Sequence, residues 1–200
     1  LYKTPWLIEY SQRVQHLIYP TLGKVKKAII MDCDNTLWKG VLGEDGFENI
    51  EMSSETRDGE IFKNVQKSLI QLSRMGVLVC LCSKNNLDDV KEVFNRHPDI
   101  TLQNDDITLM KVNWQDKATN IQEIANELNI GVDSFIFVDD SDFEVNLVKQ
   151  RHPSVDVFQV PKNLSDYLLL MNNISNYFYR DNVTDSDLKK SKEYKKQAVR

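Results

Sequence analysis

The sequence is poor in cysteine. Its 200 residues include only Cys33, Cys80 and Cys82, each in or at the end of a short apolar run. An odd number of cysteines in apolar segments does not form a disulfide framework. Free thiols persist in reducing compartments, so the composition favours a cytoplasmic protein.

Long hydrophobic runs and an excess of positive charge are also missing. No apolar stretch approaches the ~20 residues of a membrane-spanning helix, and the start does not look like a signal peptide. We therefore expect no membrane association. The net charge of −5 argues against a general nucleic-acid binder.

Short apolar segments alternate with amphipathic ones along the chain. The pattern predicts strands at 28–31, 77–82, 134–138 and 155–160. It predicts helices at 5–20, 58–75, 116–129, 142–151, 163–172 and 184–199, and one more that Asn85 or Asn86 caps and that ends before Pro98. Such alternation is typical of an α/β fold, a doubly wound parallel sheet with helices on both faces.

The expected domain organisation has three parts. Residues 1–24 form a leading helix and linker, 25–172 the α/β core, and 173–200 a C-terminal extension. Glycines within residues 37–50 indicate a flap or hairpin over the end of the first strand. The chain starts with Leu1 and stops mid-pattern, so we expect it to belong to a larger multidomain protein.

Two aspartates follow the first predicted strand. Asp32 and Asp34 are spaced to face the same side, while Cys33 points toward packing. Two carboxylates about 4 Å apart repel by roughly 4 kcal/mol at an effective dielectric of 20. A hard cation such as Mg²⁺ or a shared proton offsets that repulsion. A surface turn rich in aspartate and asparagine explains the same residues without chemistry.

Polar residues also end two other predicted strands. Ser83 follows the second strand, and Asp139 and Asp140 follow the third. Ligands of doubly wound folds bind beyond the carboxyl ends of the strands, so this convergence favours a site over a turn. Ser83 can receive phosphate oxygens or cap a helix, and Lys117 lies in a first helical turn where an anion would stabilise it.

Glu144 has a structural interpretation. The segment Ser141-Asp-Phe-Glu144 matches a capping box, in which the serine and glutamate side chains bond the main chain of the other residue. We therefore interpret Glu144 as a helix cap.

The order of these motifs resembles the haloacid dehalogenase (HAD) superfamily. The motifs are Asp-x-Asp-x-Thr at 32–36, Ser83, Lys117 and the pair Asp139-Asp140. The resemblance implies a Rossmann-like core and phosphate transfer through a phospho-aspartate with Mg²⁺. It implies Asp32 as nucleophile and Asp34 as general acid and then base. The implied metal ligands are Asp32, the Asp34 carbonyl and Asp139, and the substrate-binding residues are Thr36, Ser83, Lys84, Asn85 and Lys117.

A narrower resemblance is to the FkbH-like branch of that superfamily. Its motifs match at 34–46, 82–86, 113–118 and 127–140. The branch implies transfer of a glyceryl unit from 1,3-bisphosphoglycerate to an acyl carrier protein in polyketide biosynthesis. Cys33 and Val145 depart from its usual residues: Cys33 replaces an aliphatic residue, and Val145 stands where an arginine often follows the glutamate.

Cys82 is a candidate nucleophile for that acyl transfer. An acyl phosphate is an activated carbonyl, and a thiol beside Lys84 and a helix N-terminus is expected to have a lowered pKa. Attack by Cys82 would give an enzyme thioester that exchanges with the carrier's thiol. The alternative is a buried strand cysteine like Cys80, two residues earlier on the same face.

Three functions follow from these patterns. The first is acyl loading of a carrier protein, which the lack of room for a cap domain between Ser83 and Lys117 favours. The second is a phosphatase acting on a small phosphorylated metabolite, with Cys82 as packing. The third is a non-catalytic scaffold, which has no need for clustered carboxylates.

Overall fold

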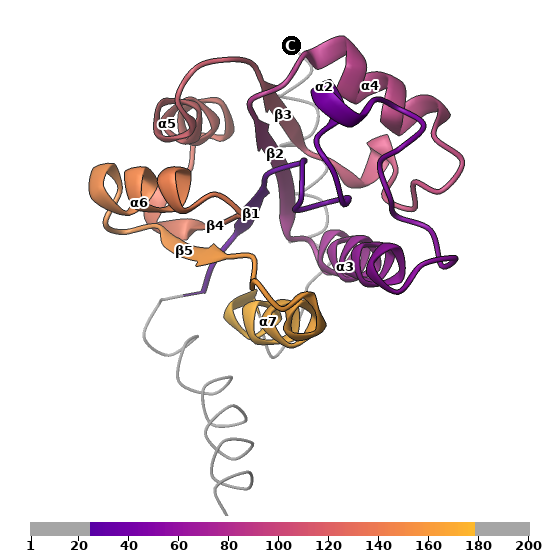
Figure 1. The fold of residues 1–200 in the computed structure, drawn as a ribbon. Coiled ribbons are helices and arrows are strands. Elements are labelled where there is room, and N and C mark those ends of the chain that lie inside the picture. Colours follow the sequence, from indigo (N-terminus) through magenta and orange to yellow (C-terminus); the bar gives the residue numbers. More distant parts are fainter. Residues whose placement is uncertain (1–24, 179–200) are drawn as a thin grey trace, which may run out of the picture.

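A five-stranded parallel sheet forms the centre of the protein (Figure 1). The computed structural model describes residues 25–178. The strand order is β3-β2-β1-β4-β5. The strands are β1 (Ala28–Met31), β2 (Leu78–Ser83), β3 (Leu109–Val112), β4 (Phe135–Asp139) and β5 (Asp156–Gln159). The expected doubly wound α/β fold is confirmed, with β1 in the middle.

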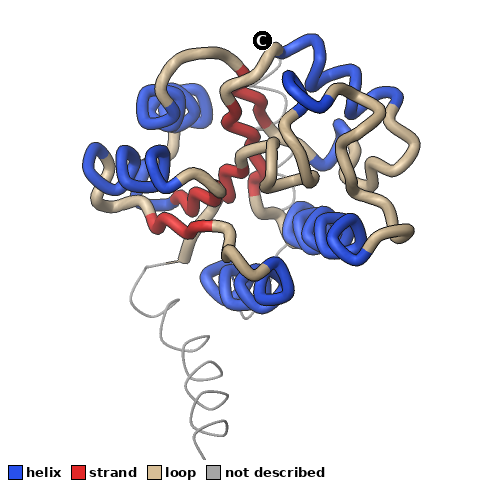
Figure 2. Tube along the Cα trace, viewed as in Figure 1, coloured by secondary structure: helices blue, strands red, loops and turns tan. Residues whose placement is uncertain are grey.

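Helices cover both faces of the sheet, as Figures 1 and 2 show. One face packs against α3 (Arg57–Arg74), α4 (Leu87–Arg96) and α7 (Tyr167–Ser175). The other packs against α5 (Lys117–Leu128) and α6 (Asp142–Arg151). Because both faces are buried, the inner strands are continuously apolar instead of alternating with polar residues.

Successive side chains of a strand face opposite sides of the sheet, so the position of a residue along its strand decides which helices its side chain contacts. Ile29 and Met31 of β1 join the core beneath α3, whereas Ala28 and Ile30 face α5. Each residue of β1 pairs in register with β2 on one side and β4 on the other. The ends of these three strands therefore lie at one edge of the sheet.

Strand β3 is missing from the sequence prediction. It is a four-residue edge strand, and its third residue is a lysine. Lys111 forms ion pairs with Glu123 and Glu127 of α5, at 3.0 and 2.5 Å. A charged residue in so short a segment removes the apolar signal by which buried strands are recognised.

The glycine-containing segment after β1 folds over the sheet edge, as expected of a flap. It holds the short helix α2 (Leu42–Asp45) and one antiparallel bridge between Lys39 and Glu51. The buried Gln66 of α3 fixes the base of this segment, because its amide donates to the carbonyl of Leu37 at 3.0 Å. Within residues 25–178 no segment forms a separate cap domain over the edge.

The expected helices at 5–20 and 184–199 lie outside the described residues. Helix α7 runs past residue 172, the expected end of the core, and Phe178 is buried beyond it. None of the helices within residues 25–178 has the length and apolar character needed to cross a bilayer.

Candidate active site

A buried lysine joins two of the strand ends. Lys117 is the first residue of α5, which begins where Asp116 accepts a hydrogen bond from the Thr119 main chain at 2.9 Å. The Lys117 ammonium lies 2.9 Å from Asp32 Oδ1 and 2.5 Å from Asp139 Oδ2. Burial by itself lowers the pKa of Lys117, but the two carboxylates raise it above its usual value.

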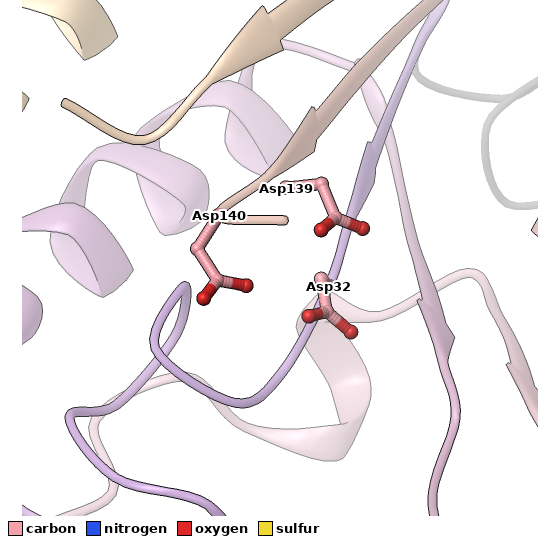
Figure 3. Close-up of side chains that lie close together, drawn as sticks. All are labelled: Asp32, Asp139 and Asp140. Atoms are coloured by element: carbon pink, nitrogen blue, oxygen red, sulfur yellow. The ribbon is translucent and has the colours of Figure 1, made fainter. Parts of the chain in front are cut away.

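Three carboxylates meet beside this lysine. Figure 3 shows Asp32 from the end of β1 converging with Asp139 and Asp140 from the end of β4. Carboxylate oxygens of the three lie within 4.8 Å of one another; we call these residues the acidic cluster. Burial, together with the charge of Asp32, raises the pKa of Asp139 to about 7, and the same causes raise the pKa of Asp140.

The acidic cluster suits a hard divalent cation. Asp32 Oδ1 is buried beside the Lys117 ammonium, 2.9 Å away. Asp139 and Asp140 add carboxylate oxygens within 4.8 Å, and such oxygens are the ligands that Mg²⁺ prefers. The expected ligands Asp32 and Asp139 both belong to the cluster. The ligand expected from Asp34 is its carbonyl, which stays a prediction.

Asp34 is held by the flap on one side and by β2 on the other. Its Oδ1 accepts hydrogen bonds from the Trp38 indole at 2.9 Å and the Leu42 main chain at 3.0 Å. Its Oδ2 accepts one from the Asn85 amide at 2.9 Å. Burial raises the pKa of Asp34 despite these bonds, which favours a carboxyl group that carries a proton for catalysis.

A pocket of about 200 Å³ opens between these groups. It brings together five of the residues expected from the sequence, and it adds two residues from the start of α6. The lining residues are Asp32, Asp34, Ser83, Lys84 and Lys117, with Ser141 and Glu144. Helix α4 is capped by Asn86, which accepts from Asp88 at 3.1 Å, so the capping alternative for Ser83 does not hold.

Two expected substrate-binding residues lie behind the pocket wall. Asn85 is 4% exposed and uses its amide on Asp34. Thr36 is fully buried, and its carbonyl accepts a hydrogen bond from Tyr167 at 3.0 Å. Their direct contact with substrate stays a prediction.

The expected low pKa of Cys82 is wrong. Its side chain is fully buried on the α5 face of β2, together with that of Cys80. Burial raises the pKa of the Cys82 thiol, and the nearby Lys117 only partly opposes this. Lys84, whose charge was expected to act on the thiol, pairs with Glu144 instead. Cys82 therefore lacks the lowered thiol pKa on which its expected role as acyl nucleophile depended.

The interpretation of Glu144 as a cap is also only half right. The Ser141 hydroxyl accepts from the Glu144 main chain at 3.4 Å, as a capping box requires. The Glu144 carboxylate, however, binds the Lys84 ammonium at 2.6 Å, and the Ser141 main chain donates to Asp139 at 2.9 Å. The Glu144 carboxylate therefore lies in the pocket and does not cap the helix.

Solved structures share this arrangement of strands and helices. The N-terminal part of BF1531 from Bacteroides fragilis, containing a phosphatase domain complexed with Mg, is 38% identical with a TM-score of 0.78. That match covers 86% of this chain and 45% of the solved one, so the chain spans about half of that protein's solved length.

A more distant match is a HAD-family enzyme, BT-2542 of Bacteroides thetaiotaomicron, in its magnesium complex. It is 16% identical with a TM-score of 0.51, covering 74% of this chain and 98% of the other. This chain has the HAD fold. No family model and no curated protein matches the sequence. The FkbH-like branch stays a prediction.

Sequence reasoning on this HAD fold missed Asp140 as a possible metal ligand. Both Asp139 and Asp140 were expected at this edge of the sheet, but only Asp139 was assigned as a metal ligand. Strand β4 ends at Asp139, and the turn into α6 brings Asp140 back toward Asp32. The Asp-Asp pair was visible in the sequence, but the turn was not.

We predict that Asp140→Asn weakens Mg²⁺ binding. Loss of a supporting group costs roughly 10- to 100-fold in metal affinity, and loss of a ligand at least as much. Isothermal titration calorimetry measures the affinity. Asp142→Asn, two residues along and exposed, is the control with unchanged affinity. Equal affinity in native protein and Asp140→Asn would exclude Asp140 from the metal site.

Proposed function

We propose that this domain is a Mg²⁺-dependent phosphatase that acts through a phosphorylated Asp32. The supporting observation is the pairing of two different carboxyl groups in one pocket. Asp32 is held by the Lys117 ammonium, 2.9 Å away. Asp34 is shielded by burial, which raises its pKa. One group is suited to attack and the other to carry a proton.

Four pocket residues share the work of this reaction. Asp32 attacks phosphorus, while Lys117 and Ser83 hold the phosphoryl oxygens. Asp34 donates a proton to the leaving oxygen and then accepts one from the water that hydrolyses the aspartyl phosphate. Asp32 and Asp139 would hold the Mg²⁺ ion, which would supply positive charge next to the phosphoryl group. Trp38 and Asn85 position Asp34 through the hydrogen bonds described above.

The comparison with BF1531 favours the same proposal. Its solved N-terminal part contains a phosphatase domain complexed with Mg, and this chain is 38% identical to it. The solved chain is also longer than the match, which supports our proposal that this domain works within a larger protein.

We predict different losses of phosphatase activity for the two aspartates. Asp32→Asn abolishes phosphate release because no nucleophile remains. Asp34→Asn lowers kcat by roughly 10²- to 10⁴-fold, the usual contribution of general acid and base catalysis. Phosphate release from glycerol phosphate with Mg²⁺ measures both. Asp88→Asn changes an exposed residue of α4 and is a control that is expected to keep native activity. Native activity in Asp32→Asn would contradict the proposal.

A second candidate is glyceryl transfer from 1,3-bisphosphoglycerate to an acyl carrier protein, with removal of phosphate. The observation that favours it is access. Within residues 25–178 no cap domain covers the pocket, so a phosphopantetheine arm has room to approach. The burial of Cys82 removes the enzyme thioester from this scheme, and the carrier's own thiol then takes up the glyceryl group.

Mass spectrometry of a phosphopantetheinylated carrier tests this second candidate. With 1,3-bisphosphoglycerate and Mg²⁺, glyceryl transfer predicts a glyceryl mass on the carrier with native protein and with Cys82→Ala. Asp32→Asn is expected to leave the acyl group phosphorylated. Phosphate release with an unloaded carrier would reject glyceryl transfer and leave the phosphatase.

A further inference from the structure

An ion pair on the pocket wall has no role in the phosphate chemistry. The Lys84 ammonium lies 2.6 Å from Glu144 Oε1, and both side chains line the pocket. The two members differ in exposure, since the lysine side chain is 35% exposed and that of the glutamate 7%. The pair therefore presents one nearly buried carboxylate beside a cation that reaches solvent.

The second oxygen of this carboxylate is unsatisfied. Glu144 Oε2 is buried and has no hydrogen-bond partner among residues 25–178. The main chain of Glu144 has its partner in Ser141, so helix capping does not account for the carboxylate. Buried polar atoms in native proteins are almost always paired, and this one borders a pocket, where it is available to a donor from a bound ligand.

Lys84 keeps hydrogen-bonding capacity of its own. An ammonium has three donors, and Glu144 Oε1 occupies one of them. The nitrogen also lies 5.8 Å from the centre of the Phe143 ring, whose residue is 67% exposed. The wall thus combines an acceptor and a donor, and the exposed Phe143 ring lies beside the lysine; we call Lys84, Glu144 and Phe143 the side subsite.

The chemistry of the side subsite selects among polar groups. A carboxylate on the ligand would be repelled by Glu144, and an ammonium on the ligand would be repelled by Lys84. A hydroxyl is neutral and both donates and accepts. It therefore satisfies Glu144 Oε2 and Lys84 at once without placing like charges together.

We propose that the side subsite binds a hydroxyl of the leaving group, so that the substrates are phosphate esters of polyols or hydroxy acids. This rests on the proposed phosphatase function and narrows its substrate class. Glu144 is a specificity residue in this account, since it contacts the part of the substrate that does not react. Plain alkyl phosphates leave Glu144 Oε2 unpaired and bind more weakly.

Binding of two phosphonates tests the side subsite without turnover. Dihydroxybutylphosphonate imitates glycerol phosphate but is not hydrolysed, and butylphosphonate lacks only the hydroxyls. Calorimetry with Mg²⁺ is expected to give roughly tenfold or tighter binding of the dihydroxy compound to native protein, as for a hydrogen bond to a charged group. In Glu144→Ala the ratio is expected to fall to about one.

Control variants separate recognition from structure. Glu144→Gln keeps an acceptor oxygen and is expected to retain part of the preference for the dihydroxy compound. Asp142→Ala, on the same helix, is expected to retain all of that preference. A merely structural role for Glu144 would weaken both phosphonates equally and leave the ratio unchanged, which would overturn the proposal. So would a ratio near one in the native protein, or failure of both compounds to bind.

Hydrolysis assays distinguish a failure of the side-subsite proposal from a failure of the proposed phosphatase function. Glycerol phosphate that is hydrolysed no better than propyl phosphate would reject the side subsite while the phosphatase stands. A binding preference that depends on Glu144, without hydrolysis of either ester, would reject the phosphatase and leave the subsite in place.

Discussion

The crowding of negative charge at one edge of the sheet is the constraint on which the site depends. Asp32, Asp139 and Asp140 place carboxylate oxygens within 4.8 Å of one another. Such an arrangement needs positive charge to persist in a buried place. Lys117 supplies it by contacting Asp32 and Asp139 together, and a divalent cation is suited to share that task.

The fold supplies this geometry through strand order. With β1 between β2 and β4, the residues after three neighbouring strands reach one pocket, and α5 starts where its first residue faces them. The flap adds the hydrogen bonds to Asp34 that distinguish its environment from that of Asp32. Two carboxylates two residues apart are thereby given different chemical tasks.

Residue patterns within short segments of the sequence predicted most of the strands and the edge of the sheet at which the site lies. The apolar runs revealed four of the five strands, and the polar residues at strand ends, among them Asp32, Ser83 and Asp139, indicated a shared site. Strand β3 was not recognisable, because its lysine is paired by residues of α5 that only the fold brings near. The raised pKa of Cys82 and the turn of Glu144 toward Lys84 likewise depend on packing between distant segments.

The most direct test of the account is to locate the phosphoryl group on the protein. Borohydride added during turnover reduces an aspartyl phosphate to homoserine, and peptide mass spectrometry finds the altered residue. The account predicts homoserine at position 32, dependent on Mg²⁺ and on substrate. Hydrolysis that proceeds with Asp32 unaltered, or with the label on another residue, would contradict it.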